Sequence, residues 1–349
     1  MTTLSADLMQ AAVMHGAQEI ECVKQLRPRV LKNNKDSVLI QVKAVGICGS
    51  DIHYFQEGGI GDTSIGRSFT PGHEFAGVVI EGTGETFGLS DGTLVAVDPA
   101  QPCGRCEWCH RGHHNLCPHH LFVGAPPTPG AMVEYIAVPA STLYPVPPSF
   151  TAQQAALLEP LGIAIHALDL AKLRPANDVV ILGAGSIGLY LLMLAAISGA
   201  GRACVIEPLE YRRRKALELG AEAVFADVEA YLAFTGGRGA DVVLEATTSQ
   251  GGPAHATQAA RIGGKVILVG IPEGNSFSLN ASLMRRKGLT LKLSRRMGDV
   301  YPRAIQLVDS GKVELGKVLS HVMPLKDVKN AFELMATYDD GVIKVILEP

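Results

Sequence analysis

Four cysteines between residues 103 and 117 place the strongest constraint on how this chain can fold. They are Cys103, Cys106, Cys109 and Cys117, separated by two, two and seven intervening residues. Short Cys-x2-Cys steps turn successive sulfurs toward one centre, so the four thiolates can surround a single tetrahedral Zn²⁺. We therefore expect a structural zinc lobe over residues 100–120, ordered partly by the metal because binding requires deprotonated thiols. A cluster of disulfides is the alternative.

The composition favours zinc over disulfides. The chain has seven cysteines, an odd number, and Cys22, Cys48 and Cys204 stand alone in the sequence. Unpaired cysteines of this kind are most simply explained by a reducing compartment, where disulfides are rare. Residues 1–15 show no cationic start followed by a long apolar run, so we expect no signal peptide. The longest apolar stretch, 189–197, is shorter than the roughly 20 residues that span a bilayer. A cytoplasmic protein with no membrane partner is expected.

Length and charge narrow the class of protein further. A chain of 349 residues should form about two domains. Its 47% hydrophobic and 19% charged residues suit a well-buried globular core. The formal net charge is −3 and there is no block of Lys and Arg, so we expect no nucleic acid partner.

The pattern of apolar residues changes near residue 151. Before it, short apolar runs between Gly, Pro and Asp predict strands at 38–45, 76–80, 94–97 and 132–138. After it, a long apolar helix over 155–173 is expected, and strands then alternate with helices. These expected strands are 179–182, 203–206, 241–245 and 265–269, with helices at 189–198 and 211–219. The alternation predicts an α/β fold with a doubly wound parallel sheet. A helix over 301–310 and short strands follow, and periodicity leaves open which domain they complete.

A glycine-rich turn follows the first of these later strands and opens a helix. Gly183 permits a tight turn, Gly185 lets a pyrophosphate approach the backbone, and Gly188 lets the helix pack close to the strand. The first helical residues, Ser186 and Ile187, offer unpaired N–H groups and the positive end of the helix dipole to phosphates. The turn therefore predicts dinucleotide binding.

The residues beyond the next strand favour NAD over NADP. Glu207 lies 19 residues after Gly188, where a carboxylate can bind both ribose hydroxyls and would repel a 2′-phosphate. Arg212, Arg213 and Arg214 argue the other way, because a guanidinium such as that of Arg212 could bind a phosphate. The alternative for these arginines is an exposed helix face.

A second metal site is predicted from separate segments. Cys48 follows an apolar strand, and His73 and Glu74 lie in a turn before another. A thiolate, an imidazole and a carboxylate could supply the three protein ligands of a catalytic zinc, with the fourth position open for water or a substrate oxygen. Taken singly, each residue has an ordinary structural explanation. Together with the cysteine lobe and the glycine turn they indicate an enzyme.

These motifs occur in an order that resembles the medium-chain zinc-dependent alcohol dehydrogenases. Residues 46–54 (GICGSDIHY) and 158–167 (LEPLGIAIHA) look most like the polyol branch, typified by sorbitol and xylitol dehydrogenases. The resemblance implies a β-rich GroES-like catalytic domain from residues 1–160 and 300–349, with an NAD-binding Rossmann domain over 161–299. It also implies one catalytic and one structural zinc per chain, and a homo-oligomer, either a dimer or a tetramer.

The resemblance assigns roles to individual residues. Cys48, His73 and Glu74 would hold the catalytic zinc, and Glu159 would bind the water or substrate at the open position, where ethanol-type relatives have a second cysteine ligand. Ser50 would take the alcohol proton and pass it through the ribose hydroxyls to His53 near the surface. Asp51 could orient His73 through a hydrogen bond. The alternatives are a solvent-facing His53 and a Ser50 that only caps a turn or helix.

The same resemblance implies a polyol substrate oxidised to a ketose, with Tyr54, Glu159 and Arg296 binding its hydroxyls. Met297 departs from the family pattern, which has a tyrosine there, so the substrate itself stays open. Tyr54 as a core aromatic and Arg296 as an exposed cation are the alternatives for these residues. A threonine-type dehydrogenase acting on 3-hydroxy amino acids and a non-catalytic dinucleotide-binding protein are the alternatives for the function.

Overall fold

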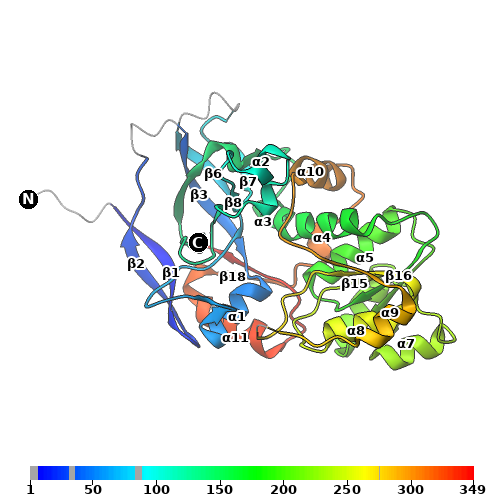
Figure 1. Ribbon diagram of the computed structural model, residues 1–349. Helices are drawn as coiled ribbons and strands as arrows, with labels where there is room; N and C mark the ends of the chain where they lie inside the picture. The colour runs from blue at the N-terminus through cyan, green and yellow to red at the C-terminus, as the bar shows by residue number, and fades with distance from the viewer. Residues whose placement is uncertain (1–6, 31–35, 83–88, 275) are drawn as a thin grey trace, which may run out of the picture. The chain divides into compact units, whose positions relative to one another are not determined.

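The computed structural model describes residues 7–30, 36–82, 89–274 and 276–349 (Figure 1). The chain forms two compact units. Unit 1 combines the residues up to Glu159 with Tyr301–Pro349, and unit 2 comprises Pro160–Val300. Among the described residues, no helix is both long and apolar enough to cross a bilayer.

Unit 1 is built on a sheet of seven described strands, in the order β11-β7-β6-β3-β19-β18, with β10 also paired to β3. Their bounds are β3 Ser37–Gly46, β6 Glu74–Gly82, β7 Leu94–Val97, β10 Tyr135–Pro139, β11 Leu143–Pro145, β18 His321–Pro324 and β19 Val345–Glu348. Every pairing in it is antiparallel except that of β18 with β19. Since β19 pairs with β3, the last residues of the chain complete the sheet that the first residues begin.

Shorter elements surround this sheet. The two-stranded pairs are β1 Leu8–Gly16 with β2 Glu19–Leu26, β4 Gly59–Ile60 with β5 Thr63–Ser64, and β8 Ala100–Gln101 with β9 Leu121–Phe122. The helices are α1 Gly49–Glu57, α2 Glu107–His110, α3 Ala152–Ala156, α10 Tyr301–Asp309 and α11 Val328–Thr337, with 3₁₀ turns η3 His114–Leu116, η4 Ala140–Thr142, η5 Leu315–Lys317 and η6 Leu325–Asp327. Helix α1 packs on α11 through Phe55 and Phe332, whose ring centroids are 5.4 Å apart.

Unit 2 is a six-stranded sheet in the order β14-β13-β12-β15-β16-β17, with every pairing parallel. The strands are β12 Asp178–Leu182, β13 Arg202–Ile206, β14 Ala223–Phe225, β15 Ala240–Glu245, β16 Ala260–Leu268 and β17 Thr290–Leu293. The helices are α4 Leu158–Ala171, which begins in unit 1, then α5 Ser186–Ile197, α6 Glu210–Glu218, α7 Val228–Phe234, α8 Gly252–Ala259 and α9 Ala281–Lys287. The strand order reverses between β12 and β15, as in dinucleotide-binding sheets. The predicted doubly wound sheet is confirmed.

The single helix expected over 155–173 is wrong. The structure has α3 and α4 instead, separated at Leu157. Helix α3 begins earlier than expected because Thr151 forms a capping box with Gln154: the Gln154 N–H donates to the threonine hydroxyl, and the Thr151 N–H donates to the Gln154 side chain. Apolar periodicity indicated a helical region but missed both its start and the break.

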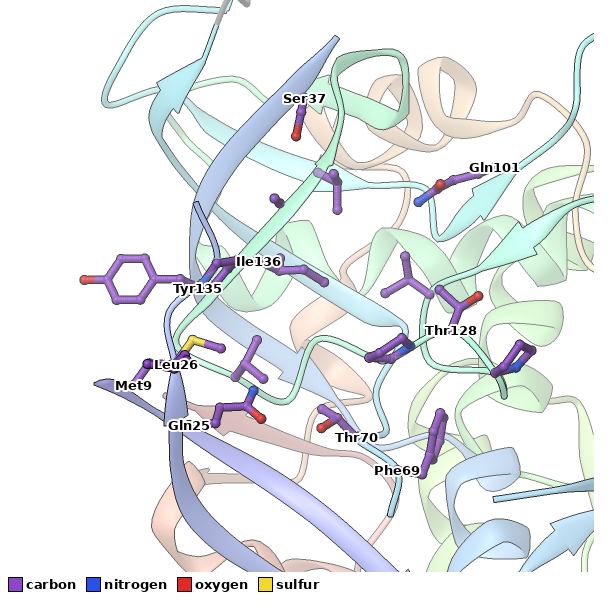
Figure 2. Close-up of a pocket in the computed structure, with 18 of the residues that line it drawn as sticks. Met9, Gln25, Leu26, Ser37, Phe69, Thr70, Gln101, Thr128, Tyr135 and Ile136 are labelled. Atoms are coloured by element: carbon purple, nitrogen blue, oxygen red, sulfur yellow. The ribbon is translucent and has the colours of Figure 1, made fainter. Parts of the chain in front are cut away.

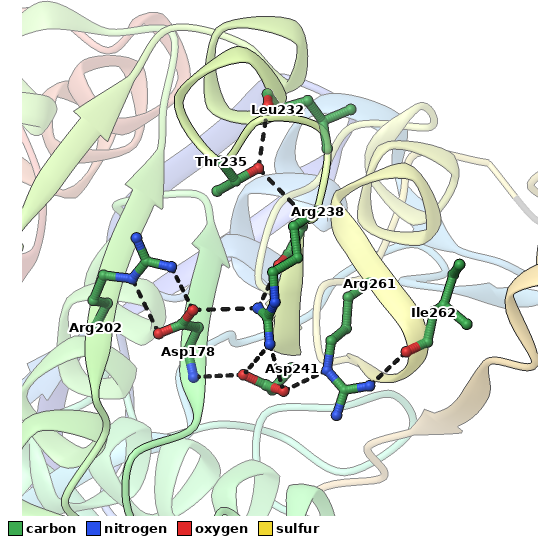
Figure 3. Close-up of polar contacts among 9 residues, drawn as sticks. Asp178, Arg202, Leu232, Thr235, Arg238, Asp241, Arg261 and Ile262 are labelled. Atoms are coloured by element: carbon green, nitrogen blue, oxygen red, sulfur yellow. Dashed lines mark hydrogen bonds and ion pairs between the residues drawn. The ribbon is translucent and has the colours of Figure 1, made fainter.

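A network of three arginines and two aspartates joins the strand beginnings in unit 2 (Figure 3). Asp178, the first residue of β12, accepts hydrogen bonds from Arg202 at 3.1 and 2.5 Å and from Arg238 at 3.3 Å. Asp241 accepts from Arg238 at 3.3 Å, from Arg261, and from the Asp178 N–H at 2.8 Å. The network fixes the amino ends of the strands, and ligands of such sheets bind at the carboxyl ends.

We expect Asp241→Asn to lower the free energy of unfolding by about 2 kcal/mol at pH 7, because charged hydrogen bonds are lost from a carboxylate that is 11% exposed. Burial alone would raise the pKa of Asp241, but the hydrogen bonds from Arg261 and the Asp178 N–H lower it below its ordinary value. The contribution is therefore present above about pH 4 and is lost as the pH falls through the folded-state pKa. Urea unfolding at pH 7 and at acidic pH measures it, with the exposed Glu229→Gln as control. Equal stability of Asp241→Asn and wild type at pH 7 would contradict the assignment.

Candidate functional site

The candidate catalytic centre lies where β3, β6 and α1 meet in unit 1. Gly46, at the end of β3, pairs with Glu74, the first residue of β6. Cys48 follows as the N-cap of α1, with φ −93° and ψ 157°. Asp51 stabilises this turn, because its carboxylate accepts the Cys48 N–H at 2.9 Å and the Gly72 N–H at 3.3 Å. The register of one strand pair therefore brings Cys48 beside the segment that carries His73 and Glu74.

The three predicted zinc ligands converge. One donor atom from each of Cys48, His73 and Glu74 lies within 4.8 Å of the other two. Metal–ligand distances of about 2.0–2.3 Å place the donors around one zinc no farther apart than this. His73 and Glu74 are 6% and 1% exposed. Nδ1 of His73 has no hydrogen-bond partner among the described residues, and it lies 3.8 Å from Oδ1 of Asp51, too far for the predicted orienting hydrogen bond.

Electrostatics at this centre also fit a cation. Burial, together with the neighbouring Glu74 carboxylate, raises the pKa of the Cys48 thiol to about 12. A thiolate at neutral pH therefore requires an adjacent positive charge, which a divalent metal supplies. The residues present fit a zinc ion held by sulfur, nitrogen and oxygen.

Glu159, the second residue of α4, belongs to the same charge cluster. It is 3% exposed and interacts electrostatically with His73, Glu74 and Cys48. Burial, with repulsion from Glu74 and Cys48, raises the pKa of Glu159 well above its ordinary value. A buried carboxyl group with a raised pKa beside three metal-binding side chains is suited to binding or exchanging a proton.

Helix α1 carries three further predicted site residues. The Ser50 hydroxyl hydrogen-bonds the Cys48 side chain, so it lies against the donor cluster. The alternative of a solvent-facing His53 is wrong: it is 6% exposed, and its Nδ1 lies 3.3 Å from Oε1 of Glu57, whose side chain is 44% exposed. Tyr54 is 6% exposed and makes an edge contact with Phe69 at 5.7 Å, inside the core of unit 1. The part that Tyr54 plays toward a substrate stays a prediction.

The cysteine lobe forms a second convergent set. Donor atoms of Cys103, Cys106, Cys109 and Cys117 all lie within 4.8 Å of one another. Sγ of Cys106 is 3.5 Å from that of Cys109 and 3.8 Å from that of Cys117, close to the roughly 3.8 Å edge of a zinc–thiolate tetrahedron with 2.3 Å bonds. All seven cysteines of the chain are free thiols, so the disulfide alternative is wrong.

Unit 2 shapes the glycine turn as predicted. Gly183 has φ +92°, and a Cβ on it would lie 2.8 Å from the Ala246 carbonyl oxygen; a Cβ on Gly188 would lie 1.9 Å from that of Gly183. Gly185 is the N-cap of α5, which begins at Ser186 and Ile187. A Cβ on Gly185 would have one neighbour within 4 Å, Nη1 of Arg212 at 4.0 Å. The space in front of this helix N-terminus suits a phosphate.

The residues after β13 line the same turn. Glu207 is 4% exposed and accepts the Ala184 N–H at 2.8 Å and the Leu209 N–H at 3.0 Å. Arg212 is 9% exposed, and Arg213 donates to the carbonyl oxygens of Glu207 and Pro208, each at 2.7 Å. The alternative of an exposed arginine face therefore holds for Arg214 but not for the other two.

Arg296 lies in unit 2, beyond β17. It is half-buried, and its backbone is left-handed, with φ +53°. Such strain in a residue other than glycine is typical of functional positions. Met297 is 5% exposed, and its Sδ would lie 2.5 Å from a Cβ on Gly162, so it packs against the start of α4. The role of Arg296 in binding a substrate stays a prediction.

A groove of about 910 Å³ lies elsewhere in unit 1 (Figure 2). Its lining includes Met9 and Gln25 of the β1–β2 hairpin and Tyr135 of β10. None of the predicted site residues lines it. Charge, burial and donor geometry gather at Cys48, so we place the chemistry there and not in this groove.

Family models match both parts of the chain. Residues 34–148 match the alcohol dehydrogenase GroES-like domain, and residues 186–310 match the zinc-binding dehydrogenase domain. The sorbitol dehydrogenase of Bacillus subtilis (strain 168) is 33% identical over 100% of this chain and 99% of its own. The chain belongs to the zinc-dependent medium-chain alcohol dehydrogenases. The GroES-like fold expected for the first part is confirmed.

Other members of this dehydrogenase family are similar over nearly their whole length. The sorbitol dehydrogenase of Bombyx mori is 34% identical over 93% of this chain and 94% of its own. A zinc-binding dehydrogenase from Sinorhizobium meliloti 1021, solved bound to NADP, matches with a TM-score of 0.86 and 28% identity, covering 98% of this chain and 99% of that one.

One charged residue of this dehydrogenase's centre was not predicted from the sequence. Lys344 is 1% exposed and forms an ion pair with Glu74. A signal was present, because this lysine interrupts the apolar run 342–347. A lone cation inside a buried apolar segment requires a buried partner.

We expect Cys106→Ser to lower the thermal stability of the dehydrogenase and to reduce bound zinc from about two ions per chain to about one, because a structural site needs all four thiolates. Metal analysis and thermal unfolding measure both effects. The control is Cys22→Ser, because Cys22 is half-buried and lies outside both clusters of metal-binding residues. Unchanged stability and zinc content in Cys106→Ser would exclude a structural zinc in the lobe.

Proposed function

We propose that this chain is a zinc- and NAD-dependent polyol dehydrogenase that interconverts a secondary alcohol of a sugar alcohol and the corresponding ketose. The observation that carries the proposal is the convergent donor set of half-buried Cys48 with buried His73 and Glu74, and with Glu159 beside it. Relatives named sorbitol dehydrogenase, D-xylulose reductase and L-arabinitol 4-dehydrogenase support the substrate class. We further propose one catalytic and one structural zinc per chain, a homo-oligomer, either a dimer or a tetramer, and a cytoplasmic location.

Different residues of the chain take different roles in the proposed reaction. When bound, zinc supplies Lewis acidity and NAD accepts a hydride. Ser50 lies against Cys48 and can relay the alcohol proton, because its hydroxyl accepts that proton as it gives up its own in the direction of His53. His53 and Glu57 are within hydrogen-bonding reach of each other, and Glu57 is half-exposed, so together they offer an exit to solvent. Glu159 holds a substrate hydroxyl or a water beside the donor cluster.

The polarity of this centre sets its selectivity. Buried groups that hydrogen-bond extra hydroxyls are left unpaired by a simple alcohol, and that penalty discriminates strongly against it. We propose Glu159, Tyr54 and Arg296 for these contacts. Glu159 is the member of this set that the structure brings into the charge cluster of Cys48 and His73.

The test is a panel of pentitols, hexitols, simple alcohols and L-threonine with the purified enzyme and NAD, followed by NADH absorbance. We expect turnover of at least one pentitol or hexitol and little with simple alcohols. Turnover of L-threonine alone would instead support the 3-hydroxy amino acid alternative. If the enzyme carries zinc but oxidises no vicinal diol in the panel, the assignment as a polyol dehydrogenase is wrong.

Glu159→Ala should lower kcat at least ~100-fold while leaving the Kd for NADH within a few-fold of wild type, because the lost group holds a substrate hydroxyl or a water at the reacting centre and does not bind the dinucleotide. Steady-state kinetics and NADH fluorescence titration separate the two quantities. Asp169→Ala, which removes an exposed carboxylate from the same helix, is the matched control. Parallel losses in turnover and NADH binding would speak against a role at the reacting centre.

For the dinucleotide we propose NAD, with the ribose hydroxyls at Glu207 and the phosphates at the turn of Gly183, Gly185 and Gly188. Arg212 reaches the same turn and would bind phosphate oxygen. We expect Glu207→Ala to reduce the preference for NAD over NADP about 10- to 100-fold, because it removes a carboxylate that repels a 2′-phosphate. The ratio of kcat/KM values for the two dinucleotides measures it, with the exposed Arg214→Ala as control. A wild-type enzyme that prefers NADP would overturn the assignment.

A further inference from the structure

Lys344 is the most enclosed cation among the described residues. It lies immediately before β19 and is 1% exposed. Its backbone is fixed by Ser320: the Lys344 N–H donates to the Ser320 hydroxyl at 3.1 Å, and the Ser320 N–H donates to the Lys344 carbonyl oxygen at 3.0 Å. The side chain therefore starts from an anchored point and extends into the interior of unit 1.

The ammonium group joins the two segments that supply the predicted zinc ligands. Nζ of Lys344 donates to the carbonyl oxygen of Ile47, the residue before Cys48, at 2.8 Å. It also pairs with Oε2 of Glu74. One carboxylate oxygen of Glu74 is thus held by the lysine, which leaves the other for a metal.

The neighbouring backbone is shaped to admit this pair. A Cβ on Gly46 would lie 2.2 Å from Oε2 of Glu74 and 3.2 Å from Cε of Lys344. Only glycine leaves that space, and the φ of Gly46 is not among the positive ones, so room and not backbone freedom explains it.

Packing alone does not explain a lysine here. Val342, Val345, Ile346 and Leu347 on either side are all fully buried apolar residues. An apolar side chain at position 344 would avoid the desolvation of a charge, and replacing buried ion pairs by apolar residues is often neutral or stabilising. Stability alone therefore does not account for the ion pair between Lys344 and Glu74.

We propose that Lys344 is a positioning residue for the catalytic metal site: it fixes the Glu74 carboxylate so that one oxygen faces the metal, and it ties that ligand to the turn of Cys48. This inference rests on the proposed function, because it requires a metal at Cys48, His73 and Glu74. Groups that orient a metal ligand typically contribute about 10- to 100-fold to metal affinity.

The experiment compares wild type, Lys344→Met and Lys344→Arg. Methionine matches the length of lysine without its charge, and arginine restores a cation that can reach the carboxylate. Zinc per chain is measured after dialysis against a chelator, together with the rate of zinc loss. The same variants are loaded with Co²⁺, whose visible and thiolate charge-transfer bands report the geometry of the site without any turnover.

We expect Lys344→Met to lose the catalytic zinc at least ~10-fold faster than wild type, to retain the lobe zinc, and to show an altered cobalt spectrum. Lys344→Arg should recover most of the retention. Gly46→Ala keeps the lysine but pushes on the Glu74 carboxylate, so it should also speed zinc loss. It tests the inference even where Lys344→Met fails to fold.

Two outcomes separate this inference from the function beneath it. A wild-type enzyme with zinc in the lobe but none at Cys48 would overturn the proposed function, and the positioning role with it. Two zinc ions in wild type, retained equally well by Lys344→Met and Gly46→Ala with unchanged cobalt spectra, would overturn the positioning role alone.

Discussion

The pairing of β3 with β6 on one side and β19 on the other is the constraint on which the candidate catalytic centre depends. Gly46 pairs with Glu74 across one edge of β3 and with Ile346 across the other. Cys48, Glu74 and Lys344 are each within two residues of this junction, although they are far apart in the sequence. A slip of one residue in either pairing would turn the side chains on that strand to the opposite face and disperse the cluster.

Local signals in the sequence predicted much of the fold, and long-range pairings explain what they missed. The spacing of Cys103 to Cys117 and the glycines of residues 183–188 act over a few residues, so the turns they predict could be located from the sequence. Strand β19 has four residues, Val345–Glu348, and its place depends on β3, about 300 residues earlier, so no periodicity reveals which sheet it joins. The break at Leu157 did have a local signal that apolar periodicity does not register: Pro160 lacks a backbone N–H and is tolerated in the first turn of a helix but not in its interior.

Burial was the least predictable property of the site residues. Arginine is usually exposed and histidine is intermediate, yet Arg212 and His53 are only 9% and 6% exposed here. His53 is paired with Glu57, one turn further along its own helix, whereas Arg212 is enclosed because another element, the turn at Gly185, supplies a surface. Lys344 went unnoticed for the same reason, since its partner Glu74 is distant in the sequence. Motif spacing identifies the donors of a site, and tertiary packing decides the charges around them.

Those charges favour a divalent ion over other occupants. Cys48, Glu74 and Glu159 are three groups that become negative on ionisation, and Lys344 offsets one of them. Asp51 is balanced separately, by the N–H groups of Cys48 and Gly72. Two negative charges would then remain in a region from which water is largely excluded, where uncompensated charge is costly. A doubly charged cation balances them, whereas without one the thiol and the Glu159 carboxyl keep their protons, as the raised pKa values of both groups indicate. The same lysine that orients Glu74 therefore also lets Glu159 ionise beside a zinc ion without leaving the centre negatively charged.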